Sequence, residues 1–242
     1  DLAWRRAAHL APVPLVGGER AVREPWRVLA AALAIEREER LLPRLPVASI
    51  VGAERLSRTA ALASGGTWPL ASGAGRSFGA AGSVRGLAAE SGGGGGIAER
   101  LEALAASHGT GVAPWEEVRL PGEAGRTALP GPALLAAAAR RTAEGEAPAA
   151  VARGFHATFV RLAVDATLRV APPEARTVAL GGGCMVNRIL LDGLVSGLRE
   201  AGLTPLAARG LPPGDGGLAY GQASLASLAL ARGEEPVLKG EV

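Results

Sequence analysis

The clearest periodic pattern near the start of the chain lies between residues 23 and 45. Pro25 stands at a plausible helix start, because proline is well tolerated in the first turn of a helix. Four apolar residues then recur at helical spacing and share one face: Trp26, Leu29, Ala30 and Leu33. This stretch predicts a helix.

Further helical patterns follow up to about residue 170. Residues 73–89 and 97–109 predict two shorter helices, and the glycine-rich residues 90–96 predict a mobile loop between them. Residues 130–168 predict a helix, a Glu-Gly-Glu break and a longer helix that contains Phe155, Phe159 and Leu162. No internal repeat is visible.

The pattern changes after the Pro-Pro pair at 172–173. Residues 176–180 form a short buried-strand pattern, and residues 203–208 can form a second strand. Between them lies a helical stripe that Gly202 ends, made of Leu190, Leu191, Leu194, Val195 and Leu198. A strand, turn, helix and strand in this order normally pair their strands in parallel. The sequence therefore predicts an α/β unit here.

Three glycines at 181–183 occupy the turn between the first strand and the helix of this unit. Glycine lets the backbone turn sharply and approach a ligand closely. The free N–H groups and the positive dipole end of the next helix favour an anion such as phosphate. A tight turn without a ligand explains the same residues, and spacing alone leaves both interpretations open.

Asp215 is the second candidate for chemistry. It lies between Pro-Pro-Gly and Gly-Gly, directly before an Ala-rich helix, which places a carboxylate at a helix N-terminus. A capping role is the commoner use of such a residue, and one carboxylate does not make a metal site. His9, His108 and His156 are isolated in sequence and have no second ligand at helical spacing.

Composition narrows the class of protein. With 242 residues, 48% of them hydrophobic, the chain is long enough for one large globular domain or two modest ones. It has no apolar run of about 18 residues and no signal-peptide pattern, so we expect no membrane association. The single cysteine, Cys184, excludes an internal disulfide and a CxxC zinc site, and is compatible with a cytoplasmic protein.

Charge argues against two further classes. The net charge is +3, and the 26 basic residues are scattered among 23 acidic ones, so no basic face predicts nucleic-acid binding. Lys239 is the only lysine, and no GxxxxGK[ST] surrounds it. A lysine-bearing P-loop is therefore excluded.

Several segments together resemble one enzyme family. The stretch "VALGGGCMVNRILLDGLVSGLREAGLTPL" and the later "LPPGDGGLAYGQA" resemble the LSGGxFQNRLLLExL and PPNDGGLALGQ patterns of the HypF carbamoyltransferases. Upstream, "PLVGGERAVREPWRVLA", "WPLASGAGRSFGAAGSVRGL" and "VARGFHATFV" resemble further HypF segments, in the family's order. The resemblance thus runs through most of the chain.

This resemblance implies a fold. HypF ends in an α/β domain of the actin-like ATPase kind, in which two ribonuclease-H-like lobes close over a nucleotide and a metal, with helices inserted. The chain resembles the second lobe with its inserted helices, and the first lobe is expected to be largely absent. We expect residues 1–170 to form the mainly helical part and residues 171–242 the ribonuclease-H-like part, which carries the nucleotide turn and the metal Asp.

The resemblance also implies a function in [NiFe]-hydrogenase maturation. In the family, upstream domains hydrolyse carbamoyl phosphate and use ATP to adenylate the carbamate. The last domain passes the carbamoyl group to the C-terminal cysteine of an acceptor protein, HypE, for synthesis of the cyanide ligand. The implied nucleotide-binding residues are Gly95, Gly182, Gly183 and Asn187, and Asp215 is the implied ligand of a divalent metal, which could be Mg, Zn or Fe.

Departures from the family pattern support an alternative, a degenerate module that binds nucleotide or docks on a partner without catalysis. The family's histidine-rich HxxxH metal motif is missing from this sequence. Gly79 stands where the family has a carboxylate, and Gly94 and Gly96 replace a Glu and a Gln beside the preserved Gly95. Cys184 is not expected to be a nucleophile, because the family has a small apolar residue there and no histidine is near in sequence.

Overall fold

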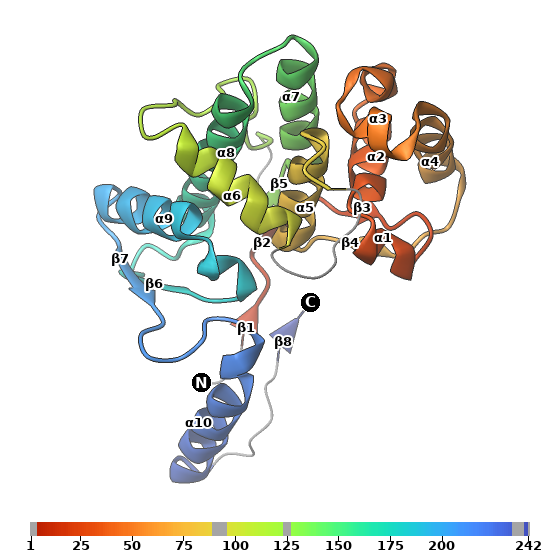
Figure 1. Cartoon of the computed structure of the whole chain (residues 1–242). Helices are drawn as coiled ribbons and strands as arrows, with labels where there is room; N and C mark the ends of the chain where they lie inside the picture. Colours follow the sequence, from red (N-terminus) through yellow and green to blue (C-terminus); the bar gives the residue numbers. More distant parts are fainter. Residues whose placement is uncertain (1–3, 89–95, 123–126, 234–239, 242) are drawn as a thin grey trace.

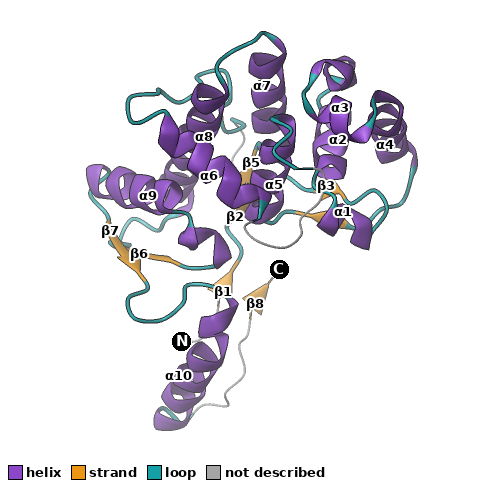
Figure 2. Cartoon of the chain, viewed as in Figure 1, coloured by secondary structure: helices purple, strands orange, loops and turns teal. Residues whose placement is uncertain are grey.

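The computed structural model describes residues 4–88, 96–122, 127–233 and 240–241 (Figures 1 and 2). Its α-helices are α1 (Glu19–Arg23), α2 (Trp26–Ile35), α3 (Val47–Val51), α4 (Ala53–Gly65), α5 (Ala74–Val84), α6 (Ile97–Ser107), α7 (Gly131–Ala143), α8 (Pro148–Val170), α9 (Arg188–Glu200) and α10 (Leu218–Ala231). Three short 3-10 helices lie among them: η1 (Glu39–Arg44), η2 (Gly183–Val186) and η3 (Asp215–Gly217).

The described strands form separate pairs rather than one sheet. Three pairs are parallel: β1 (Trp4–Arg5) with β8 (Gly240–Glu241), β2 (Ala8–Leu10) with β5 (Thr127–Leu129), and β6 (Thr177–Leu180) with β7 (Thr204–Ala207). The fourth, β3 (Val13–Pro14) with β4 (Leu70–Ala71), is antiparallel. The molecule is therefore a helical body with a small α/β unit at one end (Figure 2).

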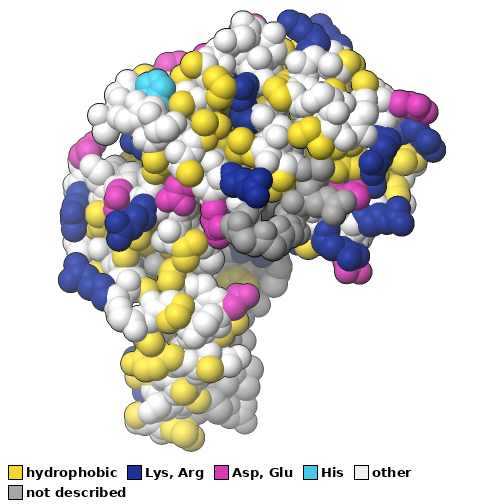
Figure 3. Space-filling view, in the orientation of Figure 1, with side chains coloured by type: hydrophobic (Ala, Val, Ile, Leu, Met, Phe, Trp, Pro, Cys, Tyr) yellow, Lys and Arg dark blue, Asp and Glu magenta, His cyan; other side chains and the backbone are white. Residues whose placement is uncertain are grey.

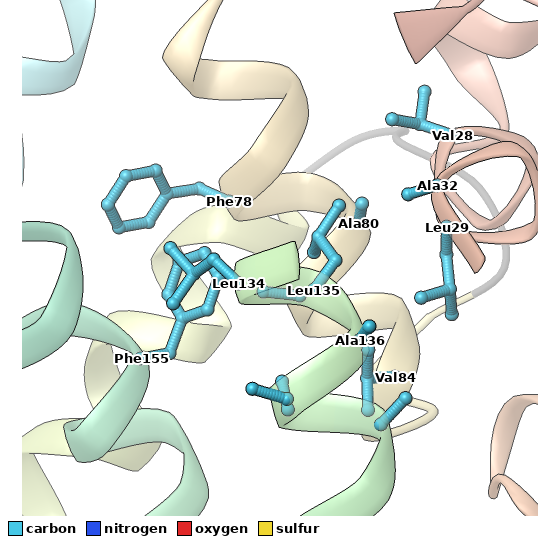
Figure 4. Close-up of a cluster of buried hydrophobic side chains, with 14 of the residues drawn as sticks. Val28, Leu29, Ala32, Phe78, Ala80, Val84, Leu134, Leu135, Ala136 and Phe155 are labelled. Atoms are coloured by element: carbon cyan, nitrogen blue, oxygen red, sulfur yellow. The ribbon is translucent and has the colours of Figure 1, made fainter. Parts of the chain in front are cut away.

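The core lies where α2, α5, α7 and α8 meet, and side chains of these four helices converge in Figure 4. The ring centroid of Phe78 lies 5.3 Å from that of Phe155 and 5.1 Å from that of Phe159. Helix α2 is buried on all sides and not on one face only, since Val28 and Ala32 are as inaccessible as Leu29. The helix predicted after Pro25 is confirmed as α2, and other helices cover it beyond the predicted apolar face as well.

The other helices predicted from residues 73 to 168 are confirmed as α5 to α8, including the break at 144–146 between α7 and α8. The predicted mobile loop at 90–96 lies almost wholly outside the described residues. No described helix has the length and apolar character needed to cross a membrane.

The predicted strand–turn–helix–strand unit is confirmed as β6, α9 and β7, with parallel strands. Strand β6 is not buried as predicted, since Thr177 and Ala179 are exposed; β7 is its sole partner among the described strands. Gly202 ends α9 with a φ of 79°, and the N–H of Leu203 donates to the carbonyl of Leu198 at 2.9 Å. Glycine adopts this left-handed conformation at no steric cost.

Helix α9 packs closely on α8, so the α/β unit is attached to the helical body. A Cβ atom on Gly193 would lie 2.8 Å from Val160, and one on Gly197 would lie 3.0 Å from Val164. These two glycines therefore permit the close approach of the helices. The predicted boundary between residues 1–170 and 171–242 falls just after α8 and stays a prediction.

Candidate functional site

The two segments that suggested chemistry lie together in the structure. The N–H of Gly182 donates a hydrogen bond to the carbonyl of Pro213 at 2.7 Å. A Cβ atom on Gly214 would lie 3.1 Å from the Cα of Gly183, so the two backbones approach too closely for a side chain there. Gly182 has a φ of 96°, which favours glycine. The glycine turn and the turn before Asp215 thus form one surface.

Helix α9 does not begin at the glycine turn, because η2 separates them. Its N-cap is Asn187, whose Oδ1 accepts a hydrogen bond from the N–H of Leu190 at 2.9 Å. The carboxylate of Glu102, on α6, accepts one from the N–H of Arg188 at 2.7 Å. The N–H groups in the first turn of α9, which the sequence predicted to be free for an anion, are therefore partly occupied by the chain's own acceptors. The prediction of a free helix N-terminus is corrected to this extent.

Asn187 is tied to a buried histidine that sequence reasoning had treated as isolated. The Nδ2 of Asn187 lies 3.0 Å from the Nε2 of His156, and the Nδ1 of His156 lies 2.8 Å from the carbonyl of Ala152. A carbonyl only accepts, so Nδ1 carries the proton and Nε2 accepts from the amide. Each group in this chain of contacts has a partner, which links α8 to the start of α9.

Burial keeps His156 neutral. Its side chain is inaccessible to solvent, and desolvation lowers its pKa from 6.5 to about 4, with a smaller lowering from the charge of Arg153. The residue is part of "VARGFHATFV", one of the segments that resemble HypF, but its partner Asn187 lies 31 positions later. Only the packing of α9 on α8 brings the two together.

Two adjacent cavities border this region. One, of about 300 Å³, is lined by Gly183 and Asn187 among others. The second, of about 380 Å³, is lined by Gly79 and Gly96, at which the sequence departs from the family pattern. Both cavities are lined also by Gly75. The structure thus places Gly79, Gly96, Gly183 and Asn187 along two neighbouring cavities. Gly94 and Gly95 lie outside the described residues.

The cysteine in this wall is not activated. Cys184 is half-buried, and burial raises the pKa of its thiol, which disfavours the thiolate. A nucleophilic role is therefore opposed by its surroundings.

Asp215 is exposed at the start of η3. The N-cap of α10 is Gly217, and no side chain caps that helix, so a capping role for Asp215 is wrong. No group of three or more His, Cys, Asp or Glu side chains that could hold a metal occurs within the described ranges. Asp215 therefore belongs to no such group among the described residues.

The fold and these motifs define a recognised class of domain. Residues 2–222 match the model of the family described as "Carbamoyltransferase, Kae1-like Domain, second subdomain". The solved full-length HypF in its phosphate- and nucleotide-bound form has a TM-score of 0.80 and 25% sequence identity over 95% of this chain and 30% of that one. The T. kodakarensis HypF structure has a TM-score of 0.77 and 26% identity over the same shares.

Curated relatives agree with this class. Carbamoyltransferase HypF2 of Cupriavidus necator is 37% identical over 91% of this chain and 29% of its own length. HypF of Rhizobium leguminosarum bv. viciae is 36% identical over 92% and 28%, and the HypF homolog of C. necator is 38% identical over 93% and 58%. The chain belongs to the HypF carbamoyltransferase family. It spans less than a third of the length of the first two relatives.

Proposed function

We propose that this chain is the carbamoyl-transferring part of a HypF-type enzyme of [NiFe]-hydrogenase maturation. The whole enzyme would use ATP and carbamoyl phosphate, and its acceptor would be the C-terminal cysteine of a HypE-like protein. The observation that carries the proposal is the Gly182–Pro213 hydrogen bond, which joins two of the segments that resemble HypF. Membership of the family supports the reaction class.

In the proposed reaction, the sulfur of the acceptor cysteine bonds to the carbamoyl carbon while the bond from that carbon to an adenylate oxygen breaks. The thiol proton passes to solvent. Gly182 and Gly183 would let the backbone approach the nucleotide, and Asn187 would fix the turn by capping α9. Gly95 remains a proposed nucleotide contact on the strength of the resemblance alone.

Asp215 remains the proposed ligand of a divalent metal. The described residues do not supply the remaining ligands, so we derive no step through a metal. Any complete metal site would need groups beyond the described residues. For the same reason we expect the 242-residue chain alone to turn over neither ATP nor carbamoyl phosphate.

The test supplies the chain with the remaining HypF segments, a HypE-like acceptor, ATP and carbamoyl phosphate, and measures carbamoylation of the acceptor by mass spectrometry. Gly183→Val is the informative variant, because a Cβ atom there meets nothing within 4 Å. Its stability should hardly change, whereas nucleotide affinity should fall about tenfold or more if the turn lies against the ligand. Gly181→Val, also in open space, is the matched control.

The alternative, a non-catalytic module that binds nucleotide or docks on a partner, is favoured by one observation. At Gly79, where the family has a carboxylate, a Cβ atom would lie only 3.2 Å from Pro25. Nucleotide binding without acceptor carbamoylation in the complete mixture would support this alternative. Equal affinity of the Gly183 and Gly181 variants for nucleotide would count against the proposed site in both functions.

A further inference from the structure

Four arginines line a pocket of about 300 Å³ among α1, α2 and α4: Arg20, Arg27, Arg55 and Arg58. Helix α4 lies on the opposite side of the molecule from α9 (Figure 1). In Figure 3, basic side chains lie over the same region, with acidic ones among them. The proposed carbamoyl transfer makes no use of this pocket.

A buried tryptophan organises two of the four guanidinium groups. The side chain of Trp26 is only 2% exposed. The guanidinium carbon of Arg27 lies 4.5 Å from the Trp26 ring centroid, and that of Arg55 lies 5.2 Å from it. Cation–π attraction of this kind holds a guanidinium in place before any ligand arrives, which lowers the entropy cost of binding.

The charges that line the pocket are not balanced. Glu24 forms an ion pair with Arg27 and lies 4.0 Å from Arg55, so one carboxylate serves two cations. Within the described part of the chain, Arg20 and Arg58 form no ion pair.

No acidic residue is among those that line the pocket. Glu19, next to Arg20, pairs with Arg23 at 3.2 Å. Glu54, next to Arg55, is exposed and is not part of the lining. Four arginines against the single carboxylate of Glu24 leave an excess of three positive charges.

We infer that this pocket binds the dianion of a phosphate monoester. Guanidinium groups present paired N–H donors that match phosphate oxygens in a bidentate manner. A dianion balances two of the three excess positive charges, whereas a single carboxylate balances only one. The volume of about 300 Å³ exceeds the need of a bare phosphate, and Leu62 and Thr59 give the wall a less polar part for the organic group.

The inference is tested by calorimetric titration of the 242-residue chain with inorganic phosphate, with glycerol 3-phosphate and with acetate at constant ionic strength. We expect saturable binding of the two phosphate compounds and none of acetate. Tighter binding of glycerol 3-phosphate than of inorganic phosphate would identify a site for monoesters. Equal binding of the two compounds would identify a site for free phosphate, recognised by the same arginines.

Variants show whether these arginines form the site. Arg20→Ala and Arg58→Ala should each weaken binding of glycerol 3-phosphate about tenfold. Arg199→Ala removes an equal charge from an exposed position on α9 and should leave the affinity unchanged. Circular dichroism checks that all three are folded. An equal loss in all three variants, no saturable binding of either phosphate compound, or tighter binding of an acidic peptide without phosphate would overturn the inference.

Discussion

At the scale of single residues, the burial of His156 makes stability dependent on pH. Burial lowers the pKa of His156 from 6.5 to about 4, so below pH 6.5 the unfolded chain binds a proton that the folded chain excludes. The contribution of this residue to stability is therefore complete above pH 6.5 and is lost as pH falls toward 4. At pH 5 the loss should be about 2 kcal/mol, at 1.36 kcal/mol per pKa unit.

Urea unfolding at pH 7, 6 and 5 measures this effect. Other groups titrate in the same range, so the comparison is with His156→Gln, which has no titrating side chain. We expect the variant to be less stable at pH 7 but to lose less stability between pH 7 and 5. Parallel pH profiles of the two proteins would contradict a buried neutral histidine.

Asn187 should contribute to stability by two separable interactions. Asn187→Ala removes the cap of the Leu190 N–H and the donor to His156. We expect a loss of about 2 to 4 kcal/mol in unfolding free energy, the sum of a cap and an unsatisfied buried acceptor. Asn187→Ser keeps a capping oxygen and should lose less. Equal losses in the two variants, measured by urea unfolding, would show that the cap contributes little.

The sequence predicted where the glycine turn and α9 lie along the chain, but it did not predict the contacts that the two make. Gly182 and Gly183 do form a sharp turn, and Gly202 does end α9, because both depend on local backbone geometry. The roles of His156 and Glu102 could not be predicted, since their partners on α9 lie 31 and 86 positions away. The same distant contacts occupy the N–H groups that a local argument had left free for an anion.

At the scale of elements, helix α5 carries the departure from the family pattern that the structure makes testable. A Cβ atom at Gly79 would lie 3.2 and 3.3 Å from the ring of Pro25, which cannot rotate away. We therefore expect Gly79→Asp to lower the unfolding free energy by about 1 to 3 kcal/mol, as overpacking does, and more if its carboxylate stays unpaired.

Thermal unfolding and ATP titration of the same Gly79→Asp samples show whether the new carboxylate strains the fold or restores a nucleotide contact. Gly79→Ala separates the steric cost from the charge, because it adds only the Cβ atom. If Gly79→Asp unfolds like the unmodified chain and binds ATP more tightly, the position is a simple loss of a ligand group. A destabilised variant without a gain in affinity would indicate that the helices have repacked around glycine.

Helices with a long periodic pattern of apolar residues were predictable from the sequence, whereas short strand pairs were not. Helices α7 and α8 follow from periodic apolar residues and the Glu-Gly-Glu break between them. Strands β2 and β5 have three residues each, and their register joins Ala8 to Thr127. Three residues give no periodic signal, and a partner more than a hundred positions away is fixed by tertiary packing alone.

At the scale of the whole molecule, α10 lies apart from the core (Figure 1). Ala229 is its only buried residue, whereas Leu218 and Leu230 are 59% and 71% exposed. Apolar surface of this kind promotes association. We expect the 242-residue chain to self-associate with rising concentration, as measured by size-exclusion chromatography with light scattering.

Two variants test whether α10 causes that association without supporting the fold. Leu218→Ser with Leu230→Ser keeps the helix but removes exposed apolar surface, and a chain ending at Gly217 removes the helix together with β8. Since α10 contributes little to the core, both should increase the monomer fraction while the thermal midpoint shifts by less than about 4 °C, which is roughly 1 kcal/mol for a chain of this size. Leu194→Ser, on the buried side of α9, should by contrast lower the midpoint well beyond that. Loss of the cooperative transition in the shortened chain would show that the segment after Gly217 supports the fold. Unchanged association in both variants would show that another surface is responsible.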